Sequence, residues 1–201
     1  KLVSRCCVFA YDFSTNHLPG TGHPYWRLDK PYWRDVGTIK AYWEAHMDLL
    51  DIDSEMTFYN PQWPVRTVSY ADPPSYSYPA GGFPCRVDSV LAAEGSRILG
   101  ASVKRSVLSR NCLVLPGAEI DECIIGQGVV VGENCRLKRV IVDAHHQIQP
   151  GSAIGFDPER DASAYTVDPA GGIVVVGMPR IQLRKNIEAP TSRFEWDTSF
   201  S

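Results

Sequence analysis

The sequence lacks long apolar runs, paired cysteine motifs and any strong excess of charge. No stretch approaches the roughly 20 apolar residues that a membrane-spanning helix needs, so we expect no membrane partner. The formal net charge of −3 over 201 residues predicts no general affinity for nucleic acid and restricts any anion site to a local cluster. The hydrophobic fraction of 44% is that of an ordinary soluble globular protein.

The cysteines include no Cys-x-x-Cys pair, which argues against a zinc site. The segment from Lys1 to Arg5 is not a signal peptide, so disulfide bonds are the weaker interpretation of the cysteines. We predict instead that Cys123 and Cys135 are small buried core residues. The sequence starts without Met in what reads as a strand, and we expect it to be the C-terminal part of a longer protein.

A helix is predicted after the segment Tyr32-Trp33-Arg34-Asp35-Val36-Gly37-Thr38. The Thr38 hydroxyl can cap its first turn. Apolar and aromatic residues then recur on one helical face: Ile39, Tyr42, Trp43, His46, Met47 and Leu50. Core packing is the interpretation of Trp43 and Met47. The carboxylate of Asp35 can bind a hard cation or stabilise the helix N-terminus, and residue type and spacing leave both open.

Residues 53–86 form a connector rich in proline and aromatic residues. The prolines interrupt regular elements, whereas a disordered linker contains few aromatics. We therefore predict an ordered, extended connector that lies against the domains on either side of it. Recognition of the proline-rich segment by a partner is the alternative.

From about residue 87 to residue 154 the sequence repeats with a period of six. Every sixth residue from Ala118 to Ile154 is apolar except Arg136, and glycines and Pro-Gly pairs mark the turns. This period fits neither a helix nor a hairpin and is typical of short strands in a parallel β-helix. Three hexads form one coil in the hexapeptide class, which predicts roughly four coils. A polar turn or helix at 157–165, a strand at 172–176 and a basic, then aromatic, tail follow.

Three segments together resemble bacterial ADP-glucose pyrophosphorylase (glucose-1-phosphate adenylyltransferase). The first is the Tyr32–Thr38 segment with its helix. The second is Phe58-Tyr59-Asn60 with Trp63-Pro64-Val65-Arg66-Thr67. The third lies in the repeat and runs Gly132-Glu133-Asn134-Cys135-Arg136-Leu137-Lys138-Arg139-Val140-Ile141-Val142-Asp143. They occur in the family's order, and their combination is far more specific than a hexapeptide repeat alone.

The resemblance implies a mostly β chain with three parts. Residues 1–52 would be the C-terminal end of a Rossmann-like α/β nucleotidyltransferase domain, residues 53–86 the connector, and residues 87–201 a left-handed parallel β-helix with a C-terminal tail. It implies synthesis of ADP-glucose and pyrophosphate from ATP and glucose 1-phosphate, in a homotetramer under allosteric control, for glycogen synthesis in the bacterial cytoplasm. The family's glycine-rich loop would precede Lys1, so we expect the 201-residue chain to be inactive alone.

The resemblance also implies roles for the first segment. Asp35 matches the family's downstream metal-binding aspartate and is the predicted catalytic ligand of Mg²⁺. Trp33 matches an aromatic residue beside the sugar phosphate, and Gly37 lets the backbone turn there. Arg34 is either a phosphate contact or an ion-pair partner. The reaction requires alignment and neutralisation of developing charge rather than covalent catalysis.

An effector site is implied in the tail. Arg180, Arg184 and Lys185 follow the strand at 172–176 much as the family's activator cluster does, and a sugar bisphosphate needs such a cluster. A solvated basic tail is the alternative. The family's inhibitor-site arginine is replaced by Ala144 and its acidic partner by Gly128, which puts inhibition by AMP in doubt.

Other function classes remain open. A hexapeptide acyltransferase would need His145 or His146 as its catalytic residue, although adjacent histidines in a strand point to opposite faces. Residues 1–84 would then have no explanation. A β-helix that assembles subunits and binds an effector without chemistry is another reading, and a synthase of a different sugar nucleotide is the third.

Overall fold

The structure is a computed structural model that describes residues 9–16, 19, 32–52, 54 and 58–177. It is mostly β, as predicted, with a stack of short strands, two α-helices and one 3-10 turn, η1 (Phe13–Thr15), in the described residues. None of these helices has the length and apolar character required to cross a lipid bilayer.

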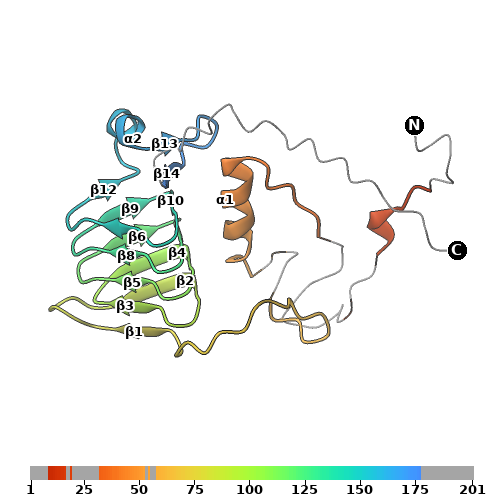
Figure 1. Ribbon diagram of the computed structural model, residues 1–201, viewed down its shortest axis with the longest axis horizontal. Helices are drawn as coiled ribbons and strands as arrows, with labels where there is room; N and C mark the ends of the chain where they lie inside the picture. The colour runs from red at the N-terminus through yellow and green to blue at the C-terminus, as the bar shows by residue number, and fades with distance from the viewer. Residues whose placement is uncertain (1–8, 17–18, 20–31, 53, 55–57, 178–201) are drawn as a thin grey trace, which may run out of the picture.

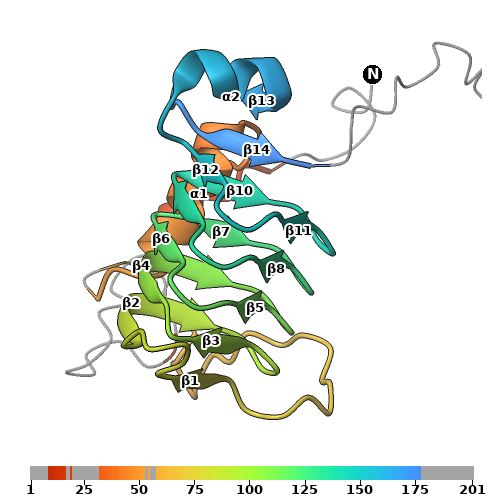
Figure 2. The same cartoon turned by 90° about the vertical axis from the view of Figure 1, so that its left-hand side faces the viewer.

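The strands wind into a three-sided solenoid (Figures 1 and 2). One side is a five-stranded parallel sheet, with one strand from each turn of the chain. In spatial order these strands are β1 (Tyr76–Tyr78), β3 (Arg97–Leu99), β5 (Leu113–Val114), β8 (Val130–Val131) and β11 (Gln147–Ile148). The solenoid therefore has about five turns, one more than the repeat predicts, because β1 adds a turn without the hexad pattern.

The other two sides share the long strands β2 (Arg86–Ala92) and β4 (Ser102–Leu108), which bend at Ser89 and Arg105. Strand β4 pairs with β6 before its bend and with β7 after it. The second side continues with β6 (Glu119–Asp121), β9 (Arg136–Lys138) and β12 (Ala153–Ile154), and the third with β7 (Ile124–Ile125) and β10 (Val140–Val142).

From β4 and β5 onwards, the repeat length is 17 residues rather than three full hexads. Glu119 pairs with Arg136, and Arg136 with Ala153, in steps of 17. A strict six-residue series therefore loses phase. It assigns Arg136 to the interior, whereas Arg136 is exposed and Leu137 is buried.

The residues that fill the solenoid recur with spacings of five or six. They are Ile98, Val103, Leu108, Val114, Ile120, Ile125, Val131, Leu137, Val142, Ile148 and Ile154. Cys112, Cys123 and Cys135 lie in the same cluster, which confirms the prediction that Cys123 and Cys135 are core residues. Each turn buries its aliphatic side chains against the next, so the stack is stabilised mainly by contacts between neighbours.

Helix α1 (Ile39–Asp48) covers the outside of the third side (Figure 1). The predicted cap is present, since Thr38 Oγ1 accepts a hydrogen bond from Ala41 N at 3.1 Å. Trp43 and Met47 form a second apolar cluster with Ile124 and Ile173. On β7, Ile125 therefore points into the solenoid and Ile124 points towards α1, which confirms the predicted packing role of the helix face.

The C-terminal end of the solenoid is covered by α2 (Pro158–Ala164) and a hairpin of β13 (Thr166–Val167) and β14 (Val174–Val176) (Figure 2). Asp157 caps α2 by accepting hydrogen bonds from Glu159 N and Arg160 N. Strand β14 pairs in parallel with β10 and antiparallel with β13. Helix α2 agrees with the polar turn or helix predicted at 157–165, and β14 agrees with the strand predicted at 172–176.

The connector is mostly exposed and is fixed to the solenoid at Arg110. The guanidinium binds Asp72, with 2.7 Å from Nε to Oδ2, and lies over the ring of Tyr70 at 3.2 Å from the centroid. Gly95 N donates to Pro73 O at 2.6 Å. The described part of the connector is thus extended and attached to the β-helix before β1 begins.

Candidate functional site

The loop before α1 presents Trp33 and Asp35 to solvent. Trp33 is 81% exposed, although its ring contacts Phe13 edge-on at 5.9 Å between centroids. Asp35 Oδ1 accepts a hydrogen bond from Gly37 N at 3.1 Å. A Cβ at Gly37 would lie 3.3 Å from both carboxylate oxygens, so glycine gives the carboxylate room to turn over the backbone. The loop therefore offers an aromatic ring and a carboxylate on the surface, two residues apart.

Arg34 is only partly exposed and binds the helix. Its Nη2 lies 3.0 Å from Glu44 Oε2, and its Nη1 binds Asp48. Partial burial disfavours the charged form, but Asp48 and Glu44 outweigh this effect and raise the pKa of Arg34. Of the two predicted roles, the structure shows the ion pair, and a phosphate contact stays a prediction.

The loop can contribute one carboxylate to a divalent cation. Within the described residues there is no group of three or more His, Cys, Asp or Glu side chains that would form a complete metal site. Mg²⁺ commonly uses one or two carboxylates and takes its other oxygens from phosphates and water. Asp35 fits that use, because it is exposed and its carboxylate accepts the Gly37 N–H through Oδ1, which leaves Oδ2 to face a cation.

Helix α1 holds the loop on the β-helix through Trp43. The indole Nε1 donates to the backbone oxygen of Glu122 at 2.8 Å. The guanidinium carbon of Arg139 lies 4.7 Å from the centroid of the same indole. Trp43 is 8% exposed and Met47 4%, so this side of the helix is closed to water. The helical pattern predicted burial of Trp43 but not its partners Glu122 and Arg139, which lie about 80 and 96 positions further along the chain and reach it only through the fold.

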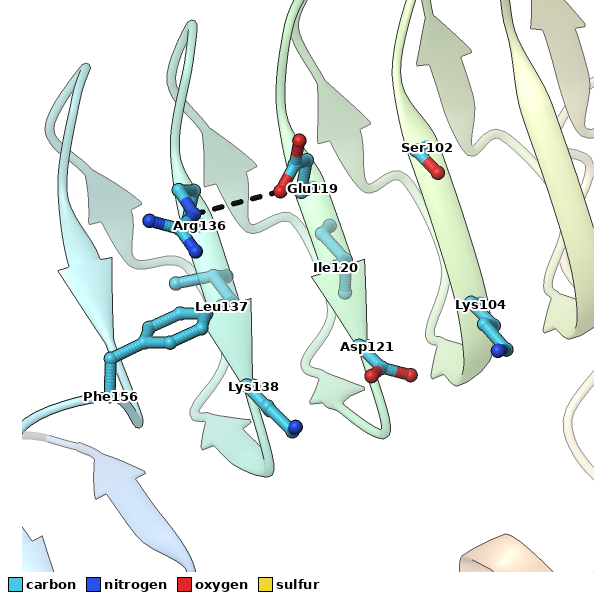
Figure 3. Close-up of a pocket in the computed structure, with 9 residues that line it drawn as sticks. All are labelled: Ser102, Lys104, Glu119, Ile120, Asp121, Arg136, Leu137, Lys138 and Phe156. Atoms are coloured by element: carbon cyan, nitrogen blue, oxygen red, sulfur yellow. Dashed lines mark ion pairs between the residues drawn. The ribbon is translucent and has the colours of Figure 1, made fainter.

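The structure also shows a shallow groove on the second side of the solenoid (Figure 3). It has a volume of about 260 Å³ and is lined by charged residues from successive turns, with Phe156 at one end. Arg136 lies over the Phe156 ring at 4.5 Å and 3.6 Å from Glu119. The groove was not predicted from the sequence, because its lining residues belong to successive turns and come together only in the fold.

The histidines are part of a solenoid corner. His145 has a positive φ of 61° and lies against Gly128, where a Cβ would be 2.6 Å from the imidazole Nδ1. His146 Nδ1 lies 3.1 Å from Ala144 O. Both histidines therefore lie in the turn between β10 and β11 rather than in a strand, and His145 is exposed. Arg180, Arg184 and Lys185, the predicted effector cluster, lie outside the described residues.

Comparison with known proteins identifies the relatives of this chain. A family described as "GlmU-like, C-terminal hexapeptide" matches residues 80–176. The glucose-1-phosphate adenylyltransferase of Corynebacterium jeikeium is 37% identical over 177 residues, which cover 88% of this chain. The chain is homologous to the glucose-1-phosphate adenylyltransferases. The enzyme of that name from Deinococcus deserti is 42% identical over 84% of the chain, and one from Vibrio parahaemolyticus is 38% identical over 87%.

The homology confirms the resemblance inferred from the three segments, and the hexapeptide match is consistent with the left-handed β-helix. The chain spans about two fifths of the length of these adenylyltransferases, with 42% of the Corynebacterium protein covered.

Proposed function

We propose that this chain is the C-terminal part of a glucose-1-phosphate adenylyltransferase. The complete protein would make ADP-glucose and pyrophosphate from ATP and glucose 1-phosphate in the bacterial cytoplasm, for glycogen synthesis. The observation that carries the proposal is the exposed Trp33–Asp35 loop on a helix seated against a hexapeptide β-helix, in a homologue of enzymes with that name.

The residues of the loop would bind and align the sugar phosphate. Trp33 offers a flat apolar surface for the sugar, and Asp35 offers an oxygen ligand for Mg²⁺. When bound, Mg²⁺ neutralises charge that develops on the phosphates. Arg34 would serve indirectly, because its ion pairs with Glu44 and Asp48 fix the loop on α1. Gly37 donates its N–H to Asp35 and so orients the carboxylate.

Replacing the Asp35 carboxylate tests this assignment. Asp35→Asn keeps a side-chain oxygen for the Gly37 N–H bond but removes the negative charge, so folding should be preserved. We expect kcat in the complete protein to fall by about 10²-fold or more, since the loss removes a charge that acts on the transition state. Steady-state assays of pyrophosphate release measure this effect.

Asp157→Asn is the matched control. Asp157 is also exposed and accepts backbone N–H bonds, but it caps α2, which lies on the opposite side of the solenoid from α1 (Figures 1 and 2). Its replacement should leave kcat unchanged because asparagine is an equally good N-cap. Equal rates in the two variants would show that Asp35 has no part in the reaction.

The proposal includes a homotetramer and a sugar-phosphate effector bound by Arg180, Arg184 and Lys185. Sedimentation of the complete protein distinguishes a tetramer from the trimer expected of a hexapeptide acyltransferase. The effector cluster is tested by measuring the reaction rate with and without a sugar bisphosphate. Activation that is lost in Lys185→Ala would support the cluster, whereas a merely solvated tail predicts no activation. The homology favours the adenylyltransferase over the acyltransferase and over synthases of other sugar nucleotides.

A further inference from the structure

One corner of the solenoid keeps bulky side chains where the backbone favours glycine. Four successive turns have positive φ there: 52° at Ser89, 41° at Arg105, 53° at Glu122 and 54° at Arg139. This conformation costs an L-residue about 1–2 kcal/mol. The first corner has no glycine at these four positions, whereas the other two corners alternate glycine with Asn111, Asn134 and His145; their glycines are Gly95, Gly100, Gly117, Gly128 and Gly151. The first corner therefore keeps its side chains at an energetic cost, which suggests that they have a role there.

This corner faces α1. Glu122 accepts the Trp43 indole N–H through its backbone oxygen at 2.8 Å and forms an ion pair with Arg105 through its side chain. Arg139, one turn further, lies over the Trp43 ring at 4.7 Å. Two adjacent turns of the corner thus bind the same indole, one at its N–H group and one at its face. This geometry fixes both the height and the rotation of α1 on the solenoid.

Arg139 also connects α1 with the C-terminal hairpin. Its Nη2 donates to Gly171 O, in the loop between β13 and β14, at 3.0 Å. Its backbone oxygen accepts from Val174 N at 3.1 Å. The Nε atom is buried and has no hydrogen-bond partner within the described structure. The guanidinium is thus held by the indole on one side and by the hairpin on the other.

The position of α1 determines the position of Asp35. Thr38 caps the helix, and the residue before it, Gly37, donates its N–H to the Asp35 carboxylate. Arg34 binds Glu44 and Asp48 on the helix surface. The loop can therefore move little relative to α1. A shift of α1 on the β-helix would move the carboxylate by a similar distance.

We infer that Arg139 is a positioning residue for the adenylyl transfer. It holds α1 through Trp43, and with α1 the Asp35 carboxylate, in register with the β-helix and the hairpin that precedes the tail. This inference rests on the proposed function, and it assigns to the β-helix a direct mechanical part in the active site.

The test compares Arg139→Met with Arg136→Met in the complete protein. Both remove an arginine in contact with an aromatic ring, but Arg136 contacts Phe156 and Glu119 instead of α1. Hydrogen exchange of the amides in residues 39–48 and the separate values of kcat and KM are measured. Arg139→Met should speed exchange in α1 at least tenfold and lower kcat by about 10–100-fold, as expected for displaced catalytic groups, with KM for glucose 1-phosphate changed less than about twofold.

Arg139→Lys covers the case in which the methionine variant does not fold. Lysine keeps the charge but cannot stack a planar group on Trp43 while donating to Gly171, so a partial loss of kcat and a partial rise in exchange are expected. Exchange and kcat equal to those of Arg136→Met would overturn the inference. If the wild-type protein makes no ADP-glucose, the proposed function fails, and unchanged exchange in α1 would still refute the role of Arg139 in holding the helix.

Discussion

Three thiols of the β-helix core are held in the neutral form. Burial raises the pKa of Cys112 to about 11 and that of Cys123 to about 12, from an ordinary value of 9.0. Burial also raises the pKa of Cys135. A thiolate is the reactive form of cysteine, so these residues are unsuited to catalysis and act as small apolar groups.

The raised thiol pKa values predict a loss of stability at high pH. Above pH 9.0 the unfolded chain releases thiol protons that the folded chain still holds, so the free energy of unfolding falls as pH rises. Each such thiol contributes about 1.4 kcal/mol per pH unit between its two pKa values. Urea titrations at several pH values measure this slope.

Cys123→Ala isolates the thiol from lysines and tyrosines that titrate in the same range. The difference in the free energy of unfolding between wild type and variant should be constant below pH 9.0. Above pH 9.0 the free energy of unfolding of the wild type should fall relative to that of the variant. A difference that does not depend on pH up to 11 would show that Cys123 ionises as freely in the folded protein as in the unfolded chain.

Single residues were predictable where their partners are close in sequence. Thr38, Asp35 and Gly37 interact within a few positions, and the motif indicates their arrangement. Ser, Arg and Glu are not typical of left-handed turns, so nothing local in the sequence indicated that Arg139 occupies a corner beside Trp43. The ion pairs of Arg34 were partly predictable. Helical spacing puts Glu44 and Asp48 on one face of α1, but their contact with Arg34 depends on how the loop folds back on the helix.

At the scale of elements, the last turn of the solenoid depends on close packing at Gly155. A Cβ there would lie 1.8 Å from Lys138 O, in the turn below. Gly151 has a similar positive φ, 73° against 88°, but nothing lies within 4 Å of its Cβ position. The two glycines therefore share a left-handed backbone that would strain any other residue, and they differ in contact with the neighbouring turn.

The two glycines predict alanine variants of unequal stability. Gly151→Ala should lose about 1–2 kcal/mol from its left-handed backbone alone. Gly155→Ala should lose about 1–3 kcal/mol more, because the methyl group forces β12 away from β9. Urea unfolding of both variants measures the difference. Equal losses would mean that the turns are not packed as closely as the structure shows.

The elements themselves were predicted to different degrees. The amphipathic pattern and cap gave α1, since both are local signals. The hexads predicted the β-helix but not the 17-residue length of each turn. One side of each turn has five residues instead of the six that a hexad assigns to it. Strand β1 was missed because Tyr76 and Tyr78 are exposed and belong to no hexad.

At the scale of the whole molecule, the described structure combines the stacked turns of the β-helix with one long-range contact, that of α1. A solenoid is stabilised mainly by contacts between neighbouring turns. The α1 contact is different, since it joins residues 39–48 to β4, β7, β10 and the residue before β14. Residues on both sides of the connector therefore belong to one apolar cluster, and through this cluster the helix that follows the Asp35 loop is attached to the β-helix and to Ile173 beside β14.

The measurement that tests the account most directly is product analysis with the complete protein. It would be incubated with Mg²⁺, glucose 1-phosphate and, in separate reactions, ATP, GTP, UTP and dTTP, and the sugar nucleotides identified by mass spectrometry. The account predicts ADP-glucose from ATP, with much slower formation of the other products. Preferred use of another nucleotide, or no sugar nucleotide from a folded protein, would contradict it.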